Sequence, residues 1–223
     1  MANTFIHQTT RIVVLAIVDS NSKFITVDVG SYGKEGDSSI FKKSVMGKNI
    51  MDNKFNFLEP QCLPVTDVKL GYYLIGDEAF GLDTAMMKPY TKRDAKNDLS
   101  KQVFNYRLCR GRRVSENAFR LLAQVFRIFY TPIAIAPETC DDLILVSCCL
   151  PNLLREGFLE ESGKSVYRLN SSDVTSHPNM QSLIHTGGYT NKTGFTVRDE
   201  LRKYFTSEAG KVSWQEDHVK RTN

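Results

Sequence analysis

The stretch RIVVLAIVDSNSKFITVDVG, residues 11–30, decides the fold class, because two runs rich in Val and Ile flank a short polar segment. Val and Ile favour strands and SNSK at 20–23 supplies turn residues, so the stretch predicts a β-hairpin. In the second run, aliphatic residues alternate with others: Phe24, Ile25, Thr26, Val27, Asp28 and Val29. This period of two predicts a strand with one buried face and one face that tolerates polar groups.

Helices are predicted downstream from apolar residues at steps of three and four. A helix begins with SSIFKKS at 38–44, where Asp37 is placed to accept hydrogen bonds from the first free backbone amides. Another helix, about residues 137–156, contains Pro151, which we expect to kink or end it. The strongest stripe is formed by Val114, Ala118, Leu121, Leu122, Val125 and Phe129.

One main domain is expected, because 223 residues that are 41% hydrophobic can enclose one sizeable core. We assign residues 1–160 to this domain; within it, residues 46–70 have weak periodicity and are expected to be mostly loop. Residues 161–194 are rich in Ser, Thr, Asn, Gly and His and are expected to form a flexible linker. The remaining residues, 195–223, predict a tail helix that can dock onto the domain.

Neither a membrane span nor a secretory signal is predicted. The longest apolar run, residues 11–19, is half the roughly 18 residues that a spanning helix needs. The first ten residues, MANTFIHQTT, have neither a basic start nor an apolar stretch, so we expect an intracellular protein. The five cysteines form no CxxC pair and are expected to fill the core rather than to bind zinc.

Positive charge gathers between residues 88 and 127. This segment contains eleven Lys or Arg residues and three acidic residues, although the whole chain carries a net charge of only +4. Such asymmetry indicates either a polyanionic partner, with phosphates the commonest kind, or a solvated helix face. On a helix, three of these arginines share a surface with Glu116 because they lie three or four positions away: Arg112, Arg113 and Arg120.

The segment YYLIGDEAF, residues 72–80, predicts a third strand that ends in an acidic pair. A buried strand normally excludes an unpaired carboxylate, so the charge of Asp77 needs compensation. Carboxylates suit Mg²⁺ and Mn²⁺, and two such ions roughly 4 Å apart can activate the attacking oxygen and stabilise the leaving oxygen of a phosphodiester. The ribonuclease H-like fold places its metal ligands in the order found here: two strands, a helix, a strand that ends in an acid, and a helix that carries Glu116. A glutamate among arginines is, however, equally typical of a surface helix with ion pairs.

Three longer motifs occur in order along the chain: FITVDVGSYGKEGDSSIFKKS, YYLIGDEAFGLDTAMMKPY and FNYRLCRGRRVSENAFRLLAQVFRIF. They resemble the PIF/Harbinger-type transposases, whose nuclease domain is of the DDE type, and the tail VRDELRKYFTSEAGKVSWQ is similar to the C-terminal segment of insect copies. By position, the resemblance implies that Asp77 is the second catalytic Asp and Glu116 the catalytic Glu, with 38 residues between them. Asp37 also lies in a family motif, where N-capping and metal contact remain alternatives.

The resemblance implies a fold as well: an α/β, ribonuclease H-like mixed sheet flanked by helices, followed by an irregular C-terminal tail. It places a first catalytic Asp in a DG(K/T)H-like motif on the central strand, and MANTFIHQTT contains no such motif. We therefore expect an N-terminally truncated domain that lacks this strand and ligand. Without the central strand, residues 11–19 and 72–77 each face a gap in the sheet with unpaired backbone groups. Residues 3–9, a rearrangement of the sheet or a partner chain would have to fill this gap.

The function implied by the resemblance is divalent-metal-dependent cleavage of DNA phosphodiester bonds, impaired here by the missing Asp. Mg²⁺ or Mn²⁺ is the expected cofactor, and the expected phosphate-binding residues are Arg110, Arg112, Arg113 and Arg120. DNA is the expected partner and a DNA-binding helper protein is a second candidate, whereas the oligomeric state is left open. A nuclear location follows only from the DNA substrate. The alternative is a catalytically inactive, transposase-derived remnant that binds DNA or a protein.

Overall fold

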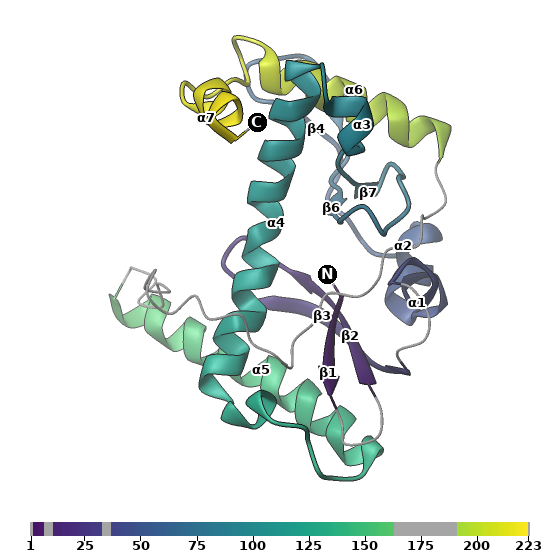
Figure 1. The fold of residues 1–223 in the computed structure, drawn as a ribbon, viewed down its shortest axis with the longest axis vertical. Helices are drawn as coiled ribbons and strands as arrows, with labels where there is room; N and C mark the ends of the chain where they lie inside the picture. Colours follow the sequence, from purple (N-terminus) through teal and green to yellow (C-terminus); the bar gives the residue numbers. More distant parts are fainter. Residues whose placement is uncertain (1, 7–10, 33–36, 163–190, 223) are drawn as a thin grey trace. The chain divides into compact units, whose positions relative to one another are not determined.

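The computed structural model describes residues 2–6, 11–32, 37–162 and 191–222. The chain divides into two units, and each is assembled from two separate segments (Figure 1). Unit 1 comprises Met1–Ser44 and Arg113–Ile184, and unit 2 comprises Val45–Arg112 and His185–Asn223. The fold is mixed α/β, as expected, but the strands of the described residues form three separate sheets rather than one.

The main sheet of unit 1 is antiparallel and has the strand order β1-β2-β3. Strands β2 (Arg11–Val18) and β3 (Phe24–Tyr32) form the predicted hairpin. Strand β1 (Ala2–Ile6) pairs with β2 along the edge where the sequence predicts a gap. Of the three expected ways to fill that gap beside β2, pairing by the N-terminal residues is therefore the one observed.

Two irregularities in β3 change which side chains face the core. The pairing register skips Ile25, which is 60% exposed, so Phe24, Val27 and Val29 all pack against the same core cluster. Strict alternation from Phe24 to Val29 is therefore wrong, because a bulge moves every later side chain to the other face. The register also skips Gly30, whose φ of 107° is a conformation that favours glycine.

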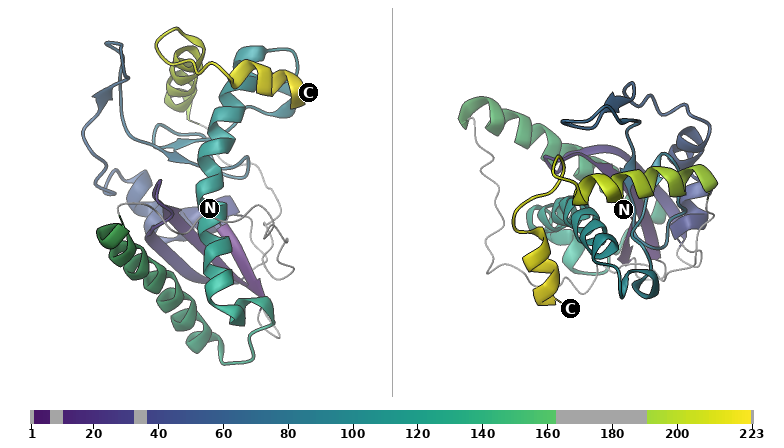
Figure 2. Two further views of the ribbon diagram at one scale, coloured as in Figure 1. Left: turned by 90° about the vertical axis from the view of Figure 1, so that its left-hand side faces the viewer. Right: turned by 90° about the horizontal axis from the view of Figure 1, so that it is seen from above.

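Helices α4 (Leu99–Val125) and α5 (Pro137–Ser162) provide the apolar partners of this sheet in unit 1. The core joins both helices to one face of β2 and to Phe24, whose ring packs edge-on against Phe119 with centroids 5.3 Å apart. Figure 2 shows α5 running alongside the strands in its left-hand view. The core residues from the two helices include Ala118, Phe119, Leu122, Ala123, Cys140, Ile144 and Cys148.

Helix α5 continues through Pro151 to Ser162, so the expectation that Pro151 ends it is wrong. Contacts on both sides of the proline hold the helix to the sheet. Cys148 is buried in the core, and Asn152 forms two hydrogen bonds with the backbone of Phe24. Because these anchors lie within one turn of Pro151, packing offsets the loss of one backbone hydrogen bond.

Several shorter elements also depart from the sequence-based expectations. Residues 46–70 are mostly irregular, as expected, but they begin within a helix, α2 (Val45–Met51), which buries Met46 and Ile50 four positions apart. The predicted long stripe ends earlier, since α4 stops at Val125 and Phe129 belongs to a 3-10 helix, η1 (Arg127–Tyr130). Helix α1 (Asp37–Lys43) begins where the sequence predicts, although the Asp37 side chain lies outside the described part.

The acidic segment contributes a strand of only two residues to unit 2. Strand β6 (Leu74–Ile75) pairs in parallel with β7 (Met86–Met87), and β4 (Gln61–Cys62) pairs with β5 (Lys69–Leu70). The prediction of a strand throughout YYLIGDEAF is therefore too long. Gly71 and Gly76 flank the paired residues, and glycine weakens strands because it loses more backbone entropy and offers no side chain for packing.

The C-terminal segment packs within unit 2, as the expected docking of the tail requires. Helix α6 (Lys192–Thr206) contributes Leu201 to a cluster with Leu82, Met87, Tyr90 and Phe104. Two further helices, α3 (Lys92–Ala95) and α7 (Gln215–Thr222), complete the unit. Most of the expected linker, residues 163–190, lies outside the described residues, and its two ends belong to α5 and α6.

None of the helices in the described part of the chain is both long and apolar enough to cross a bilayer. Cys140 and Cys148 are buried in the core as expected, and burial raises the pKa of Cys148 to about 12. Cys62 and Cys149 are exposed instead, so core filling is wrong for these two.

Candidate active site

Asp77 lies directly after the parallel strand pair of unit 2. The backbone N–H of Gly76 donates to the carbonyl oxygen of Met87 (2.9 Å), which ends the pairing of β6 with β7. One carboxylate oxygen of Asp77 then accepts a hydrogen bond from the backbone N–H of Ala79 at 2.9 Å. This short turn fixes the direction of a half-buried carboxylate. Its second oxygen has acceptor capacity that no hydrogen bond from the described part of the chain uses.

Gly76 is closely packed immediately before Asp77. A Cβ atom at this position would lie 3.0 Å from the sulfur of Met86 and 3.1 Å from side-chain atoms of Phe80. Both distances are shorter than ordinary van der Waals contacts, so a larger residue would require the Met86 and Phe80 side chains to shift by a few tenths of an ångström.

Lys88 leaves β7 at the end where Asp77 leaves β6. Parallel pairing of Leu74 with Met86 and of Ile75 with Met87 brings these two chain segments together. The ammonium group of Lys88 lies 3.5 Å from the carbonyl oxygen of Glu78. Burial lowers the pKa of Lys88 and the nearby charge of Arg198 lowers it further, whereas the negative charges of Glu78 and Asp77 act in the opposite direction.

Arg198 on α6 is a second cation close enough to Lys88 in unit 2 to lower its pKa. Its guanidinium carbon lies 3.9 Å from the ring centroid of Tyr90 and 5.1 Å from that of Phe195. Burial lowers the pKa of Arg198. Sequence analysis missed this residue, although it lies three positions before Leu201 and four after Gly194, on the buried side of the tail helix.

Glu116 lies on α4 within unit 1 and is half-buried. The helix is continuous here, so Arg113 lies one turn before Glu116 and Arg120 one turn after it, as the spacing predicts. Arg113 is exposed, and Arg120 is half-buried. This part of α4 therefore combines one carboxylate with two cations on neighbouring turns.

Arg110 and Arg112, the other two predicted phosphate-binding residues, belong to unit 2. The guanidinium carbon of Arg110 lies 4.4 Å from the ring centroid of Trp214, and its Nη1 atom is 3.4 Å from the hydroxyl oxygen of Tyr106. Trp214 also contacts Tyr106 edge-on, with ring centroids 5.8 Å apart. Trp214 therefore anchors the tail to α4, and Arg110 covers it.

The structure places the predicted site residues in both units. Asp77, Arg110 and Arg112 belong to unit 2, whereas Glu116 and the remaining predicted residues, Asp37, Arg113 and Arg120, belong to unit 1. Within the described residues, no group of three or more His, Cys, Asp or Glu side chains is placed to hold a metal ion. Asp77 and Glu116 are nevertheless oxygen donors of the kind that Mg²⁺ and Mn²⁺ bind.

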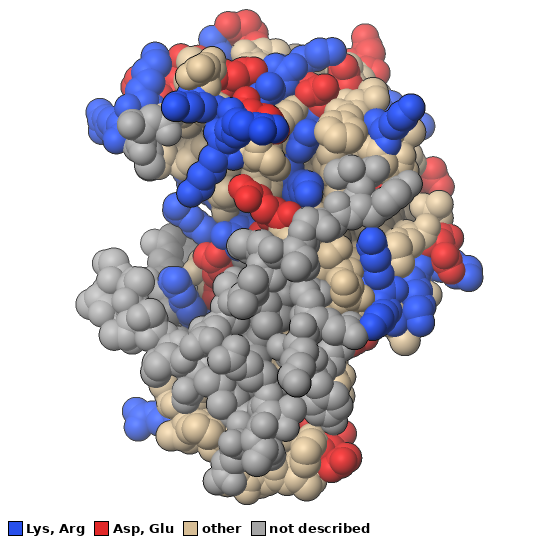
Figure 3. All heavy atoms as spheres, turned by 45° about the vertical axis from the view of Figure 1, so that its right-hand side comes forward, with Lys and Arg blue, Asp and Glu red and all other residues tan. Residues whose placement is uncertain are grey.

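Charge on the molecular surface is mixed rather than of one sign. On the face drawn in Figure 3, Lys and Arg side chains are interspersed with Asp and Glu over the described residues. Several cations are paired with acids at short range, such as Lys203 with Glu200 (2.7 Å). Within residues 88–127, Arg93 lies 3.9 Å from Asp94 and Lys101 lies 3.6 Å from Asp98, so nearby acids offset part of the positive charge of this segment.

Comparison with known proteins identifies the family. Residues 3–152 match the family described as DDE superfamily endonuclease, which is about two thirds of the chain. The chain therefore belongs to the DDE superfamily endonucleases. No curated protein and no solved structure gives a comparable match.

Membership of this family defines the class of activity. The family is one of endonucleases, so its members are hydrolases that act on DNA, and DDE-type endonucleases generally use divalent metal ions. The matched segment includes Asp77, Lys88 and Glu116, whereas Arg198 lies outside it. The tail helix of unit 2 thus adds a cation to surroundings that the family segment otherwise provides.

Proposed function

We propose that the chain is a Harbinger-like DDE nuclease that cleaves DNA phosphodiester bonds with Mg²⁺ or Mn²⁺. Asp77 and Glu116 are the proposed metal ligands, and Asp37 is a further candidate. The observation that carries the proposal is the Asp77 carboxylate, which a backbone N–H orients at the end of a strand inside the matched segment. An oriented carboxylate loses little conformational entropy when it binds an ion.

The proposed roles of the protein groups follow from their chemistry. A bound divalent ion supplies Lewis acidity toward the phosphodiester. Asp77 and Glu116 contribute the negative charge that retains the ion, while Arg113 and Arg120, each one turn from Glu116, bind the flanking phosphates. Water or a DNA 3′-hydroxyl is the proposed nucleophile.

DNA is the proposed partner, and a nuclear location follows from it. Arg110 and Arg112 are the proposed phosphate-binding residues of unit 2. The stacking of Arg110 on Trp214 supports this role, because a guanidinium held against an aromatic ring is oriented before a phosphate arrives. A DNA-binding helper protein remains a proposed second partner.

Metal binding provides the test. Titration of Mn²⁺ into the protein by calorimetry should give saturable binding, and Asp77→Asn should weaken it at least tenfold, because it removes one negative charge and one ligand oxygen. Asp67→Asn is the matched control, since Asp67 is an exposed carboxylate in the same unit. Equal Mn²⁺ affinity for Asp77→Asn and wild type in folded samples would exclude the proposed ligand.

Cleavage of supercoiled DNA distinguishes the nuclease from the alternative. Nicking that needs Mn²⁺ and disappears in Asp77→Asn supports the proposal. DNA binding without turnover, weakened in the double variant Arg112→Gln with Arg113→Gln, would instead favour an inactive DNA-binding module.

A further inference from the structure

A second charged site lies beside Asp77, and the parallel strand pair creates it. Pairing of Ile75 with Met87 directs the next residues of both strands to the same end of the small sheet. Lys88 is the first residue after β7, and its ammonium group approaches the carbonyl oxygen of Glu78. Register therefore places one cation at the same end of the strand pair as Asp77.

Helix α6 brings the second cation to this end, because its N-terminus is fixed to the loop before β7. The backbone N–H of Asn191 donates to the carbonyl oxygen of Leu82 (2.9 Å), and its side-chain amide donates to Asp83 (3.3 Å). A Cβ atom at Gly194 would lie 2.9 Å from the Asp83 backbone, so only glycine permits this approach. Arg198 follows one turn later.

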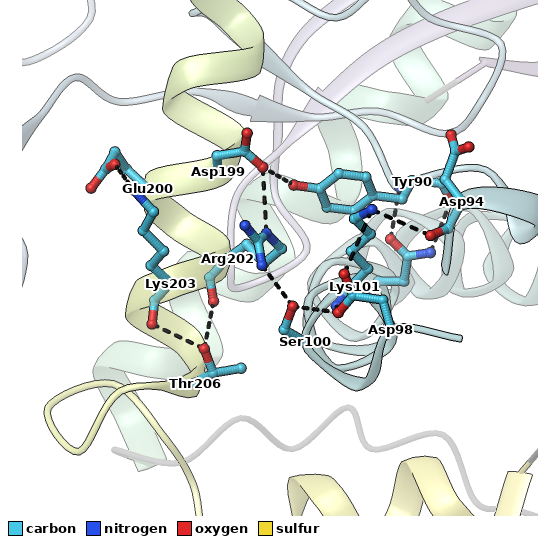
Figure 4. Close-up of polar contacts among 11 residues, drawn as sticks. Tyr90, Asp94, Asp98, Ser100, Lys101, Asp199, Glu200, Arg202, Lys203 and Thr206 are labelled. Atoms are coloured by element: carbon cyan, nitrogen blue, oxygen red, sulfur yellow. Dashed lines mark hydrogen bonds and ion pairs between the residues drawn. The ribbon is translucent and has the colours of Figure 1, made fainter. Parts of the chain in front are cut away.

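The Arg198 side chain is held rigidly by a polar network around Tyr90. The Tyr90 hydroxyl donates to Asp199 at 2.6 Å, and Arg202 links Asp199 to Ser100 and so to Asp98 (Figure 4). The backbone of Tyr90 is clamped by a hydrogen bond in each direction with the Asn105 side chain, at 2.7 and 2.9 Å. Stacking on this fixed ring leaves the guanidinium of Arg198 little freedom.

Arg198 nevertheless has unused binding capacity. It is only 8% exposed, and its Nε atom is buried without a hydrogen-bond partner. Within the described residues it forms no ion pair, whereas its neighbour Arg202 pairs with Asp199 at 3.4 Å. Tyr90 and the negative charge of Asp199 favour the charged form of Arg198, but they leave Nε without an acceptor. A buried donor without a partner is costly, so its retention indicates a ligand that supplies the missing acceptor.

We propose that Lys88 and Arg198 form a binding site for a backbone phosphate of DNA beside Asp77. A phosphodiester carries one negative charge and several acceptor oxygens, which suit the planar fork of arginine and the point charge of lysine. This inference rests on the proposed function, because it assigns two residues that position the DNA substrate of that site. Both residues are positioning residues for the strand rather than ligands of the ion.

The salt dependence of DNA binding tests the site. For each phosphate that the protein no longer neutralises, the slope of log K against log salt concentration should fall by about 0.9. Fluorescence anisotropy with a labelled duplex at 50–200 mM NaCl should therefore give a slope lower by about 0.9 for Lys88→Gln. Arg198→Lys keeps the charge but loses the planar fork, so it should weaken binding without lowering the slope. Lys203→Gln is the matched control on α6, because Lys203 already pairs with Glu200, and its slope should equal that of wild type.

Circular dichroism and Mn²⁺ binding, measured on the same variants, distinguish a folding defect and a metal-site defect from loss of the phosphate site. If Arg198→Lys fails to fold by circular dichroism, Lys88→Gln alone decides, and a wild-type slope for this folded variant overturns the inference. Retained Mn²⁺ binding in Lys88→Gln, with a reduced DNA slope, separates the phosphate site from the metal site and supports both. If Lys88→Gln retains Mn²⁺-dependent nicking and its slope equals that of wild type, only the phosphate site is overturned.

Inorganic phosphate distinguishes the source of the ligand. If wild-type protein binds no DNA, the proposed function fails and so does a DNA phosphate at Lys88 and Arg198. In that case, calorimetric binding of inorganic phosphate that is lost in Lys88→Gln would identify a site for a free anion instead. For a protein that binds DNA, inorganic phosphate should compete only at millimolar concentration, and competition at micromolar concentration would overturn the DNA assignment.

Discussion

At the scale of single residues, Tyr90 carries the strongest polar coupling in unit 2. Burial, together with the hydrogen bond to Asp199 and its negative charge, raises the pKa of Tyr90 from 10.0 to about 12. The folded state therefore favours the neutral phenol more than the unfolded state does. This preference contributes stability that is fully present below pH 10 and is lost as the pH rises toward 12.

Urea unfolding between pH 8 and pH 12 should reveal this contribution. We expect the free energy of unfolding of wild type to fall by about 1 to 2 kcal/mol over the upper part of this range because of Tyr90 alone. Tyr90→Phe cannot ionise, so the difference between the two proteins isolates the contribution from other titrating groups. Parallel pH profiles for the two proteins would contradict the prediction.

Val65 is the most unfavourable backbone position among the exposed residues of unit 2. It has a φ of 60° and is 88% exposed, in a turn closed by the Thr66 N–H and the Leu63 carbonyl oxygen at 3.0 Å. A β-branched residue is strained at positive φ, whereas glycine is not. Val65→Gly should therefore raise the free energy of unfolding by about 1 kcal/mol, even though glycine increases the entropy of the unfolded chain.

Thermal unfolding by circular dichroism checks this prediction against a matched control. Val68 lies in the same hairpin at a negative φ, so Val68→Gly gains no relief from strain and should lower the melting temperature. A lower melting temperature for Val65→Gly as well would show that the Val65 side chain contributes packing that outweighs its strain.

The residues of the candidate site could be predicted from the sequence only in part. The acid after an apolar run identified Asp77, and helical spacing identified Arg113 and Arg120 around Glu116. Arg198 was missed because a charged residue on an amphipathic helix is normally assigned to solvent. In the structure Arg198 is instead buried against the ring of Tyr90.

At the scale of elements, each unit contains an asparagine side chain that forms hydrogen bonds with both the N–H and the carbonyl group of a single residue. Asn152 on α5 donates to and accepts from Phe24, and Asn105 on α4 does the same for Tyr90, with distances of 2.7 to 2.9 Å. Phe24 starts β3, which among the described strands pairs with β2 alone. The amide of Asn152 thus acts as an added strand residue at that edge.

Asn152→Asp should therefore destabilise unit 1 by about 2 kcal/mol, because an oxygen would replace the nitrogen that faces the Phe24 carbonyl. Chemical denaturation with near-ultraviolet detection provides the measurement. Asn97→Asp, at an exposed position, is the control and should change stability by less than about 0.5 kcal/mol. An effect of Asn152→Asp as small as that of the control would mean that water replaces the clamp.

Periodicity predicted the elements whose core contacts lie on one regular face. The hairpin of β2 and β3 and helices α1, α4, α5 and α6 are of this kind. It failed at Ile25 and Gly30, since each bulge inserts one residue and reverses the alternation after it. It also failed for α2 and β1, because a helix of two turns gives too few repeats and an edge strand is defined by its partner.

At the scale of the whole molecule, the segment that matches the family and the two structural units have different boundaries. The match covers residues 3–152 continuously, whereas the units divide that same stretch at Ser44 and at Arg112. Family membership could be predicted from motif order, since motifs are linear in the sequence. The division could not, because it depends on which distant segments share a core.

Hydrogen exchange along α4 should report the two cores separately. Residues 103–108 contribute Phe104 and Leu108 to unit 2, and residues 118–123 contribute to the core of unit 1. In Asn152→Asp, we expect exchange at 118–123 to accelerate by about thirtyfold while exchange at 103–108 stays the same. Equal acceleration of both segments would show that the units unfold together.

The two-segment construction of each unit also determines when the protein can fold during its synthesis. The core of unit 1 includes Cys148 near the end of α5, and that of unit 2 includes Leu201 on α6. Translation adds about 5 to 20 residues per second, so strands β2 and β3 leave the ribosome many seconds before their helical partners. Until then, the apolar face of the hairpin is exposed, so chaperones should bind nascent chains of this protein between the synthesis of β3 and that of α5.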